Sequence, residues 1–191
     1  GYPEHDDFKQ FWPANVQVVG KGILRFHAAI FPGILLGLGL PLARQLYVHC
    51  YVTVDSKKMS KSLSNSVSPN DIIAKYGADA FRYYFLRHIP SYDDGDFSWE
   101  AFEAAYNNEL ANELGNAVQR TVAMVQKYQG GVVGDIPKPE HDMGAYGEAI
   151  ELCKFDRALD SVWEQVRGLN QLIDTEKPWE IAKTDDADHL R

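Results

Sequence analysis

Residues 16–34 read VQVVGKGILRFHAAIFPGI, which is a short apolar run followed by apolar residues at helical spacing. The run from Val16 to Val19 is rich in β-formers and ends at Gly20, which is typical of a buried strand. After Gly20, the spacing of three and four residues predicts a helix. The segment is therefore predicted to be a strand that enters a helix.

A second strand signal follows this helix. Residues 46–54 are apolar and rich in β-formers, and the sequence KMSKS comes soon after, at residues 58–62. The order strand, helix, strand and loop predicts the second half of a doubly wound, Rossmann-like nucleotide-binding sheet, whose ligands bind outside the carboxyl ends of the strands. We therefore expect Gly20, Lys21 and the loop at residues 55–65 to face one ligand.

The remainder of the sequence has helical signals. Ser68 and Pro69 are typical of a helix start, and another helix is expected at residues 78–87. Apolar residues at spacings of three and four mark one long helix over residues 99–128 and a second over residues 152–173. We expect these two long helices to pack antiparallel through their apolar stripes.

These signals divide the chain into three parts. We predict an α/β part at residues 1–65, a helical connector at residues 66–96 and an α-helical bundle at residues 97–191. The expected fold class is therefore α/β followed by all-α.

The composition is that of a folded domain. The chain has 191 residues, of which 45% are hydrophobic and 24% charged. The long apolar run at residues 34–42 is shorter than the roughly 20 residues of a bilayer span, and no secretory signal is visible. Cys50 and Cys153 lie far apart without metal-ligand spacing. We therefore predict no metal site, no disulfide framework and no membrane anchor, and we expect a reduced, cytoplasmic protein.

The net charge of −8 is unevenly spread. Residues 43–88 carry seven Lys or Arg and three acids, whereas residues 131–191 carry seven and fourteen. We expect any RNA contacts to cluster in the middle of the chain and on selected helix faces. Four basic side chains of the connector are candidates for phosphate contact, with solvated charges or ion pairs as the alternative: Lys75, Arg82, Arg87 and His88.

The two lysines and the serines of KMSKS suit the binding of a polyphosphate. A lysine ammonium is a compact charge on a flexible stem, and it can follow a triphosphate as charge builds on the departing pyrophosphate. Ser60 and Ser62 add hydroxyl donors. Because the same pattern is common on solvated loops, the neighbouring sequence has to decide.

Four further strings surround this loop in order: FWPAN at residues 11–15, GKGILRFH at 20–27, DAFRYY at 79–84 and DGDFS at 94–98. Together with KMSKS they resemble the methionyl-tRNA synthetases, a family of class I aminoacyl-tRNA synthetases, over most of the chain. The resemblance implies activation of methionine by ATP with Mg²⁺, transfer to tRNA(Met), a bundle that binds the anticodon and a connector that contacts the tRNA stem.

The resemblance also implies which residues serve the nucleotide. The loop lysines would stabilise the departing pyrophosphate, and Lys61 is the one most closely tied to that step. The backbone of Val52 would recognise adenine. The implied catalytic residues are Lys58, Ser60, Lys61 and Ser62, and the implied ATP contacts are Gly20, Val52 and Lys61.

For the amino acid, the resemblance implies a pocket lined by Ile23, His27 and Phe31, which follow one another at helical spacing. Without the resemblance, His27 reads as a core histidine. The family generally has tryptophan in place of Phe31, and it has an aspartate that binds the ribose hydroxyls in place of Gly22. Cys50 replaces a usual glycine.

For the anticodon, the resemblance implies contacts by Asn116, Arg120 and Trp179. Asn116 and Arg120 are four residues apart and share a helix face. A tryptophan offers a stacking platform, and Asn and Arg can hydrogen-bond the edge of an unstacked base. The alternative is a surface Asn and Arg beside a Trp at the edge of the core.

No His-x-Gly-His string occurs in the chain, although class I synthetases use these histidines to hold the ATP phosphates. We therefore expect the N-terminal half of the enzyme, with any zinc-binding insertion, to be missing, and the isolated fragment to be catalytically incompetent. Residues 21–40 should then expose apolar surface. The alternatives are a stand-alone tRNA-binding or scaffold module without catalysis, and another nucleotidyl-transferring class I enzyme. The extent of the bundle beyond Trp179 stays open.

Overall fold

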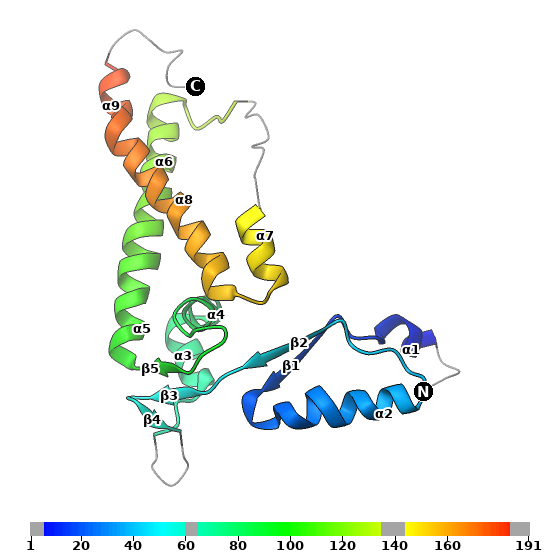
Figure 1. Ribbon diagram of the computed structural model, residues 1–191. Coiled ribbons are helices and arrows are strands. Elements are labelled where there is room, and N and C mark those ends of the chain that lie inside the picture. The colour runs from blue at the N-terminus through cyan, green and yellow to red at the C-terminus, as the bar shows by residue number, and fades with distance from the viewer. Residues whose placement is uncertain (1–5, 60–64, 135–143, 184–191) are drawn as a thin grey trace.

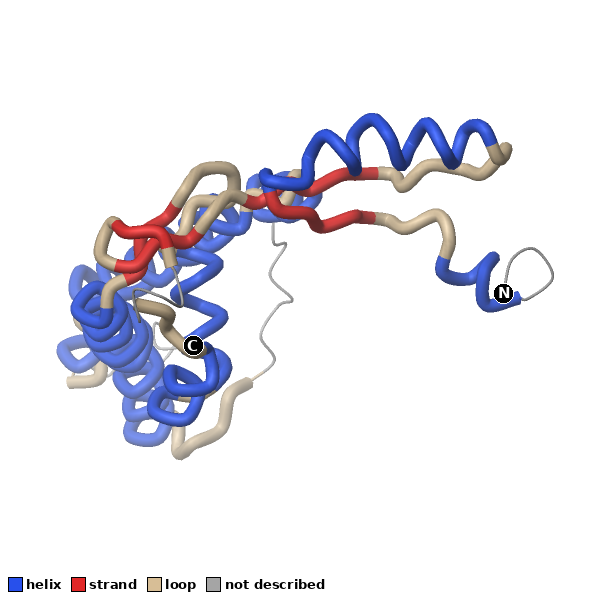
Figure 2. Tube along the Cα trace, turned by 90° about the horizontal axis from the view of Figure 1, so that it is seen from below, coloured by secondary structure: helices blue, strands red, loops and turns tan. Residues whose placement is uncertain are grey.

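The computed structural model describes residues 6–59, 65–134 and 144–183. An α/β arm, residues 6–49, extends away from a mainly helical body formed by the rest of the described chain (Figures 1 and 2). The arm begins with the short helix α1 (Asp6–Phe11).

The arm is built on a two-stranded parallel sheet. Its strands are β1 (Val16–Gly20) and β2 (Gln45–His49), with Gly20 paired to His49 at their carboxyl ends. Parallel strands need a crossover connection, and this one is helical, as the sequence predicted. It consists of the 3₁₀ turn η1 (Lys21–Ile23), the π-helical η2 (Phe26–Ile30) and the α-helix α2 (Phe31–Gly37).

Much of the apolar surface of the arm is exposed. Val19, Leu35 and Tyr47 are its buried core residues, whereas 64% of Val18 and 55% of Ile30 are exposed. The apolar surface expected over residues 21–40 is therefore present. Other exposed apolar side chains of the arm are Phe11, Val16, Ile23, Leu24, Phe26, Ile34, Leu36, Leu38 and Leu42.

The expected strand over residues 46–54 is wrong as a single strand. Strand β2 ends at His49, and a separate strand, β3 (Val52–Val54), begins in a different sheet. The physical reason lies at Tyr51, whose backbone N–H donates to the Asp94 carboxylate at 2.8 Å rather than to a neighbouring strand.

The second sheet has three strands in the order β4-β3-β5. β3 pairs antiparallel with β4 (Lys57–Lys58) and parallel with β5 (Gly95–Phe97). The hairpin turn between β3 and β4 has positive φ at Asp55 and Ser56, which is the backbone twist that a two-residue hairpin prefers. This turn brings the chain to the start of the lysine-serine loop.

One aromatic-rich core joins this sheet to the helices. It lies between β3, β5, α3 (Pro69–Tyr76), α4 (Ala78–Arg87) and α5 (Trp99–Ala105). Residues from all three predicted parts of the chain therefore share one core, and the boundaries at 65 and 96 stay a prediction. Its buried members are Val54, Ile72, Ala80, Tyr84, Phe97, Phe102 and Ala105.

The long helix expected over residues 99–128 is confirmed. It comprises α5, the π-helical η4 (Tyr106–Leu114) and α6 (Gly115–Tyr128). Gly130 and Gly131, both with positive φ, follow its end. Ser98 caps its start by accepting a hydrogen bond from the N–H of Ala101 at 3.1 Å.

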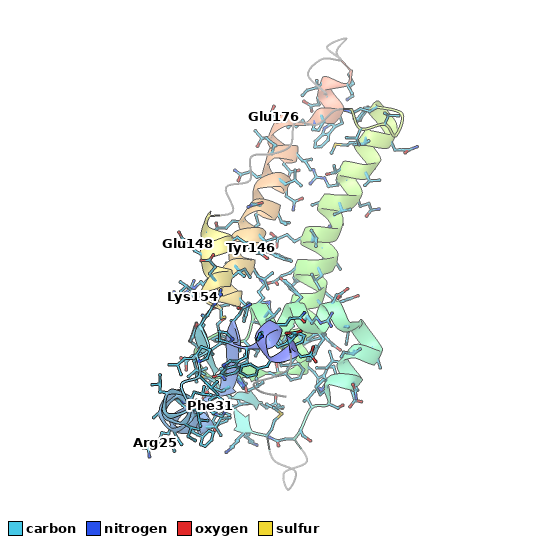
Figure 3. The ribbon with its side chains drawn as sticks, turned by 90° about the vertical axis from the view of Figure 1, so that its right-hand side faces the viewer. Arg25, Phe31, Tyr146, Glu148, Lys154 and Glu176 are labelled. Atoms are coloured by element: carbon cyan, nitrogen blue, oxygen red, sulfur yellow. The ribbon has the colours of Figure 1, made fainter. Side chains whose placement is uncertain are left out.

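The expected antiparallel packing of the two long helices is wrong, because α8 (Phe155–Glu176) runs parallel to the long helix (Figure 1). Asn170 donates to the carbonyl of Glu113 at 3.2 Å, and Asp174 pairs with Arg120 further along, so the contacts advance in the same direction on both helices. The return is made by α7 (Gly144–Glu151), which packs against α8, and α9 (Pro178–Ile181) follows. Figure 3 labels Lys154 and Glu176 at the two ends of α8.

Candidate functional site

The predicted nucleotide residues gather where the chain passes from the first sheet to the second. Gly20 ends β1, Val52 begins β3, and Lys58 ends β4. The amines of Lys21 and Lys58 lie 4.8 Å and 5.4 Å from the centroid of one ring, that of Tyr51. The carboxyl end of β1 and the start of the lysine-serine loop therefore meet at this ring.

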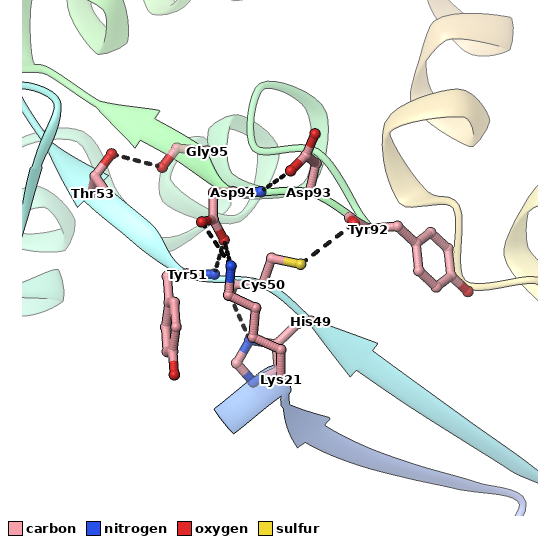
Figure 4. A network of polar contacts seen from close by, with 9 residues as sticks. All are labelled: Lys21, His49, Cys50, Tyr51, Thr53, Tyr92, Asp93, Asp94 and Gly95. Carbon is pink, nitrogen blue, oxygen red and sulfur yellow. Dashed lines mark hydrogen bonds and ion pairs between the residues drawn. The ribbon is translucent and has the colours of Figure 1, made fainter. Parts of the chain in front are cut away.

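Lys21 is held by an acidic side chain from the body (Figure 4). Its Nζ lies 2.5 Å and 2.7 Å from the two carboxylate oxygens of Asp94. The same carboxylate accepts the N–H of Tyr51. The hydrogen bond with Asp94 raises the pKa of Lys21, and the bonds from Lys21 and Tyr51 lower the pKa of Asp94. Both groups are therefore charged at neutral pH.

A second carboxylate, that of Asp96, fixes the turn before the loop lysines. It accepts hydrogen bonds from the Thr53 hydroxyl at 2.5 Å and from the N–H of Ser56 at 2.8 Å. These bonds lower the pKa of Asp96. The hairpin that carries Lys58 is thus held on β5.

The other residues of the predicted catalytic loop, Ser60, Lys61 and Ser62, lie outside the described residues, and their roles stay predictions. The side chain of Lys58 is exposed, and its carbonyl accepts a hydrogen bond from Asn65 at 3.2 Å.

Two of the three predicted methionine-binding residues line one pocket. His27 and Phe31 line a cavity of about 210 Å³ between the helical crossover (η2 and α2) and the β1–β2 sheet. Leu35 and Leu46 line it as well. Ile23 is 52% exposed and lies outside this lining, although its carbonyl is 3.0 Å from His27 Nδ1. The cavity is mainly apolar, with a histidine at its edge.

Two of the predicted anticodon residues, Arg120 on α6 and Trp179 on α9, lie close together. The guanidinium of Arg120 is 5.9 Å from the ring centroid of Trp179, and it pairs with the carboxylate of Asp174 at 2.5 Å. Asn116 is exposed one turn before Arg120 on α6. A cavity of about 180 Å³ lies between α6 and the start of α9, lined by Thr121, Met124, Val125, Tyr128, Gln129 and Pro178, the residue before Trp179. A cation, an aromatic ring and a hollow thus share one end of the bundle.

The four basic connector residues all take part in ion pairs. The most buried of them, Arg87, pairs with Glu109 at 3.2 Å and Asp160 at 3.4 Å and lies over the ring of Trp163. This joins α4 to both long helices. His88 also lies 3.0 Å from Glu109, Lys75 pairs with Glu103, and Arg82 pairs with Asp79. Each of the four basic connector residues therefore has the ion pair that was the alternative to phosphate contact.

Glu109 is the acidic centre of this junction. It accepts hydrogen bonds from Tyr83 and His88. Burial alone would raise the pKa of Glu109, but these bonds and the charge of Arg87 lower it. Burial, together with the bond to Glu109, holds the pKa of Tyr83 well above its ordinary value.

The described residues contain neither a cluster of metal-binding side chains nor a membrane-spanning helix. Among residues 6–59, 65–134 and 144–183, no group of three His, Cys, Asp or Glu side chains is placed to hold a metal ion. Over the same ranges, no helix has the length and apolarity to span a bilayer.

Three side chains at these sites were not predicted from the sequence. In the sequence, Tyr51 is one residue of an expected strand, and Asp94 is the first residue of the DGDFS string. Asp174 is one charge among several on an acidic helix. Each acts through a partner distant in sequence; Asp94 and Lys21, for example, are 73 positions apart. Local patterns carry no signal for such pairs.

Comparison with known proteins places this geometry in a family. Residues 2–122 match the family described as "tRNA synthetases class I (M)". The methionine–tRNA ligase of Clostridium perfringens is 41% identical over 97% of this chain and 30% of its own length. That of Caldanaerobacter subterraneus subsp. tengcongensis is 40% identical over 96% of this chain and 31% of its own length. The chain thus spans about a third of these relatives.

Solved structures agree. The crystal structure of Mycobacterium tuberculosis methionyl-tRNA synthetase bound by methionyl-adenylate superposes with a TM-score of 0.85 at 31% identity, over all of this chain and 40% of that one. The apo form of the same enzyme superposes with a TM-score of 0.81 at 28% identity, over all of this chain and 39% of that one.

Proposed function

Because the chain belongs to the methionyl class I tRNA synthetases, we propose that it supplies the carboxyl-terminal part of an ATP site and the anticodon-binding helices of a methionine–tRNA ligase. One observation supports the ATP site above the others. The amines of Lys21 and Lys58 meet over Tyr51, outside the carboxyl ends of β1 and β2, where α/β sheets bind their ligands.

The proposed chemistry is the attack of the methionine carboxylate on the α-phosphate of ATP, with release of pyrophosphate. ATP enters with Mg²⁺ as substrate. Lys58 and Lys61 stabilise the charge that builds on the pyrophosphate, and Ser60 and Ser62 add hydroxyl donors. Gly20 and Val52 bring backbone groups to the nucleotide.

Methionine is proposed to occupy the cavity lined by His27 and Phe31. A thioether side chain is flexible and polarizable and makes favourable contacts with aromatic rings. The cavity offers one such ring from Phe31 and a polar edge from His27. Ile23 lies outside the lining, and its carbonyl contacts the imidazole of His27 one turn before the cavity.

The bundle is proposed to bind the anticodon of tRNA(Met) through Asn116, Arg120 and Trp179. An unstacked base can stack on the Trp179 ring, while Asn116 and Arg120 donate to its edge. The proximity of Arg120 and Trp179 supports a single base site formed by α6 and α9. The connector then lies toward the tRNA stem, and its charges are already engaged in ion pairs.

The division of the chain into an α/β part, a connector and a bundle at residues 65 and 96 belongs to this proposal. Because the chain spans about a third of its relatives, we expect the 191 residues alone to bind RNA without aminoacylating it. A cytoplasmic location is part of the same proposal.

The anticodon assignment is tested by titrating the chain with an RNA hairpin that carries the loop CAU and with the same hairpin carrying GAU, at one salt concentration. Tryptophan fluorescence reports binding. We expect tighter binding and stronger quenching by CAU, and the loss of both in Trp179→Ala.

Trp99→Phe is the matched control, because Trp99 lies at the other end of the long helix. Equal, salt-sensitive binding of both hairpins would overturn the anticodon assignment and leave nonspecific phosphate contact.

A further inference from the structure

Tyr51 has a backbone fixed on both sides. Its N–H donates to the Asp94 carboxylate at 2.8 Å, and its carbonyl accepts the N–H of Gly95 at 3.0 Å. Asp94 is held in turn by Lys21 (Figure 4). The direction in which the Tyr51 side chain leaves the main chain is therefore set by the rest of the fold.

The Tyr51 ring lies between two lysines that differ in their partners. Lys21, 4.8 Å from the ring centroid, is already paired with Asp94. Lys58, 5.4 Å from the centroid, has no acidic partner within the described part of the chain. A cation over an aromatic face is attracted by the ring quadrupole. The ring is thus the cation–π partner of the Lys58 amine in this structure.

Gly22 makes room for this ring. A Cβ atom added at Gly22 would lie 2.6 Å from the Tyr51 hydroxyl oxygen, but 3.8 Å from the ring carbon that bears it. The first distance is a clash and the second is an ordinary contact. A side chain at position 22 therefore excludes the hydroxyl from its present place, but it tolerates a phenylalanine ring.

We infer that Tyr51 is a positioning residue for Lys58, and that glycine at position 22 leaves the space in which the Tyr51 hydroxyl lies. The inference rests on the proposed function, because a positioned Lys58 amine has a use only if ATP phosphates bind next to it. The roles of the two residues are linked: Gly22, which follows β1, leaves room for the ring of Tyr51, which follows β2.

The test is competitive acetylation of the complete gene product with trace acetic anhydride, read by mass spectrometry as the ratio of Lys58 to Lys127 labelling. Lys127 is the internal control, because its amine lies 5.2 Å from the ring of Tyr128 on α6, far along the bundle. Tyr51→Leu removes the cation–π contact that holds the Lys58 amine against the ring. We expect the ratio to rise about two- to fivefold.

Three further variants separate the ring from the hydroxyl. Tyr51→Phe keeps the ring and leaves the ratio as in the wild type. Gly22→Ala displaces the ring and raises the ratio as Tyr51→Leu does. Gly22→Ala combined with Tyr51→Phe returns it to the wild-type value, because the clash is gone.

The same measurement with ATP and Mg²⁺ keeps the two proposals apart. Protection of Lys58 by ATP in the wild type, weakened in Tyr51→Leu, supports both. A ratio that rises in Tyr51→Leu without any protection by ATP supports the positioning role and overturns the proposed ATP site. A ratio unchanged by Tyr51→Leu, or raised equally by Gly22→Ala in both backgrounds, overturns the inference whether or not ATP protects.

Discussion

Lys21 Nζ lies 2.5 Å from Asp94 Oδ1, although 73 residues separate the two in the sequence. Because Asp94 also accepts the N–H of Tyr51, one carboxylate joins the end of β1 to the segment between the two sheets. This is how the arm is tied to the body at the point where the nucleotide is proposed to bind.

We predict that Asp94→Asn lowers stability in a pH-dependent way. The pKa of Asp94 is lowered by its bonds to Lys21 and Tyr51. Its contribution is therefore present above the ordinary carboxyl pKa of about 4 and is lost as pH falls through the lower folded-state pKa. Urea midpoints of wild type and variant should differ at pH 7 and converge as the pH falls through the folded-state pKa of Asp94.

The control for this measurement is Asp6→Asn. Asp6 is fully exposed and only loosely paired with Lys9, at 3.8 Å. Its substitution should leave the urea midpoint unchanged across the pH range. A difference between Asp94→Asn and wild type that persists unchanged at low pH would show that the carboxylate charge does not matter at this position.

A second prediction concerns the junction of the connector with the two long helices. Glu109→Gln leaves the buried guanidinium of Arg87 with Asp160 as its remaining acidic partner and weakens the bonds from Tyr83 and His88. We expect a loss of about 1–3 kcal/mol in the free energy of unfolding, because a largely buried charged group loses a partner.

The measurement is guanidinium-induced unfolding followed by circular dichroism. Glu113→Gln is the matched control, because Glu113 lies one turn further along the same helix. Its bond with Asn170 uses the backbone carbonyl, which the substitution keeps. Equal unfolding curves for the two variants would contradict the role assigned to Glu109.

Helices and the first strand could be predicted from the sequence because their signals are local. The strand at 16–19 and the long helix at 99–128 follow from periodicity within one segment. The break between β2 and β3 could not be predicted, because the Tyr51 N–H is redirected by a carboxylate 43 residues away. The direction of α8 depends on the return through α7, and an apolar stripe is the same for either direction.

The candidate site also has a part that the sequence predicts and a part that it does not. The KMSKS lysines and the GKG turn were found as motifs, since each is a contiguous string. The arrangement that brings Lys21, Lys58 and Tyr51 together could not be found, because it requires the crossover and the hairpin to be folded. The pairing of Arg120 with Asp174 likewise requires the parallel direction of α8.

A third prediction concerns Gly77, which separates α3 from α4. Its φ of 86° and ψ of 160° lie in a region that is essentially restricted to glycine. We expect Gly77→Ala to lower the free energy of unfolding by about 1–3 kcal/mol through backbone strain. Gly33→Ala, in a helix with open space at the added Cβ, should leave stability unchanged or raise it by about 0.5–1 kcal/mol. Thermal unfolding of the two variants compares them, and a Gly77→Ala protein as stable as Gly33→Ala would contradict the assignment.

The fourth prediction concerns the charge beside the proposed base site. Asp174 neutralises Arg120 and places a carboxylate next to the position proposed for an RNA base. Asp174→Asn therefore removes a repulsive charge and leaves Arg120 available to phosphates as well as to base edges. We expect tighter binding of both the CAU and the GAU hairpin, and a smaller ratio between their affinities, because the gain is independent of sequence.

Fluorescence titration at several salt concentrations measures this directly. If Arg120 gains a phosphate contact, the dependence of log Kd on log salt should steepen by about one counterion in the variant. Glu176→Gln is the control, because its side chain is exposed at the end of α8 and no ion pair with Arg120 involves it. An Asp174→Asn protein with unchanged salt dependence and an increased preference for CAU would instead mean that the carboxylate had been withholding Arg120 from the base edge alone.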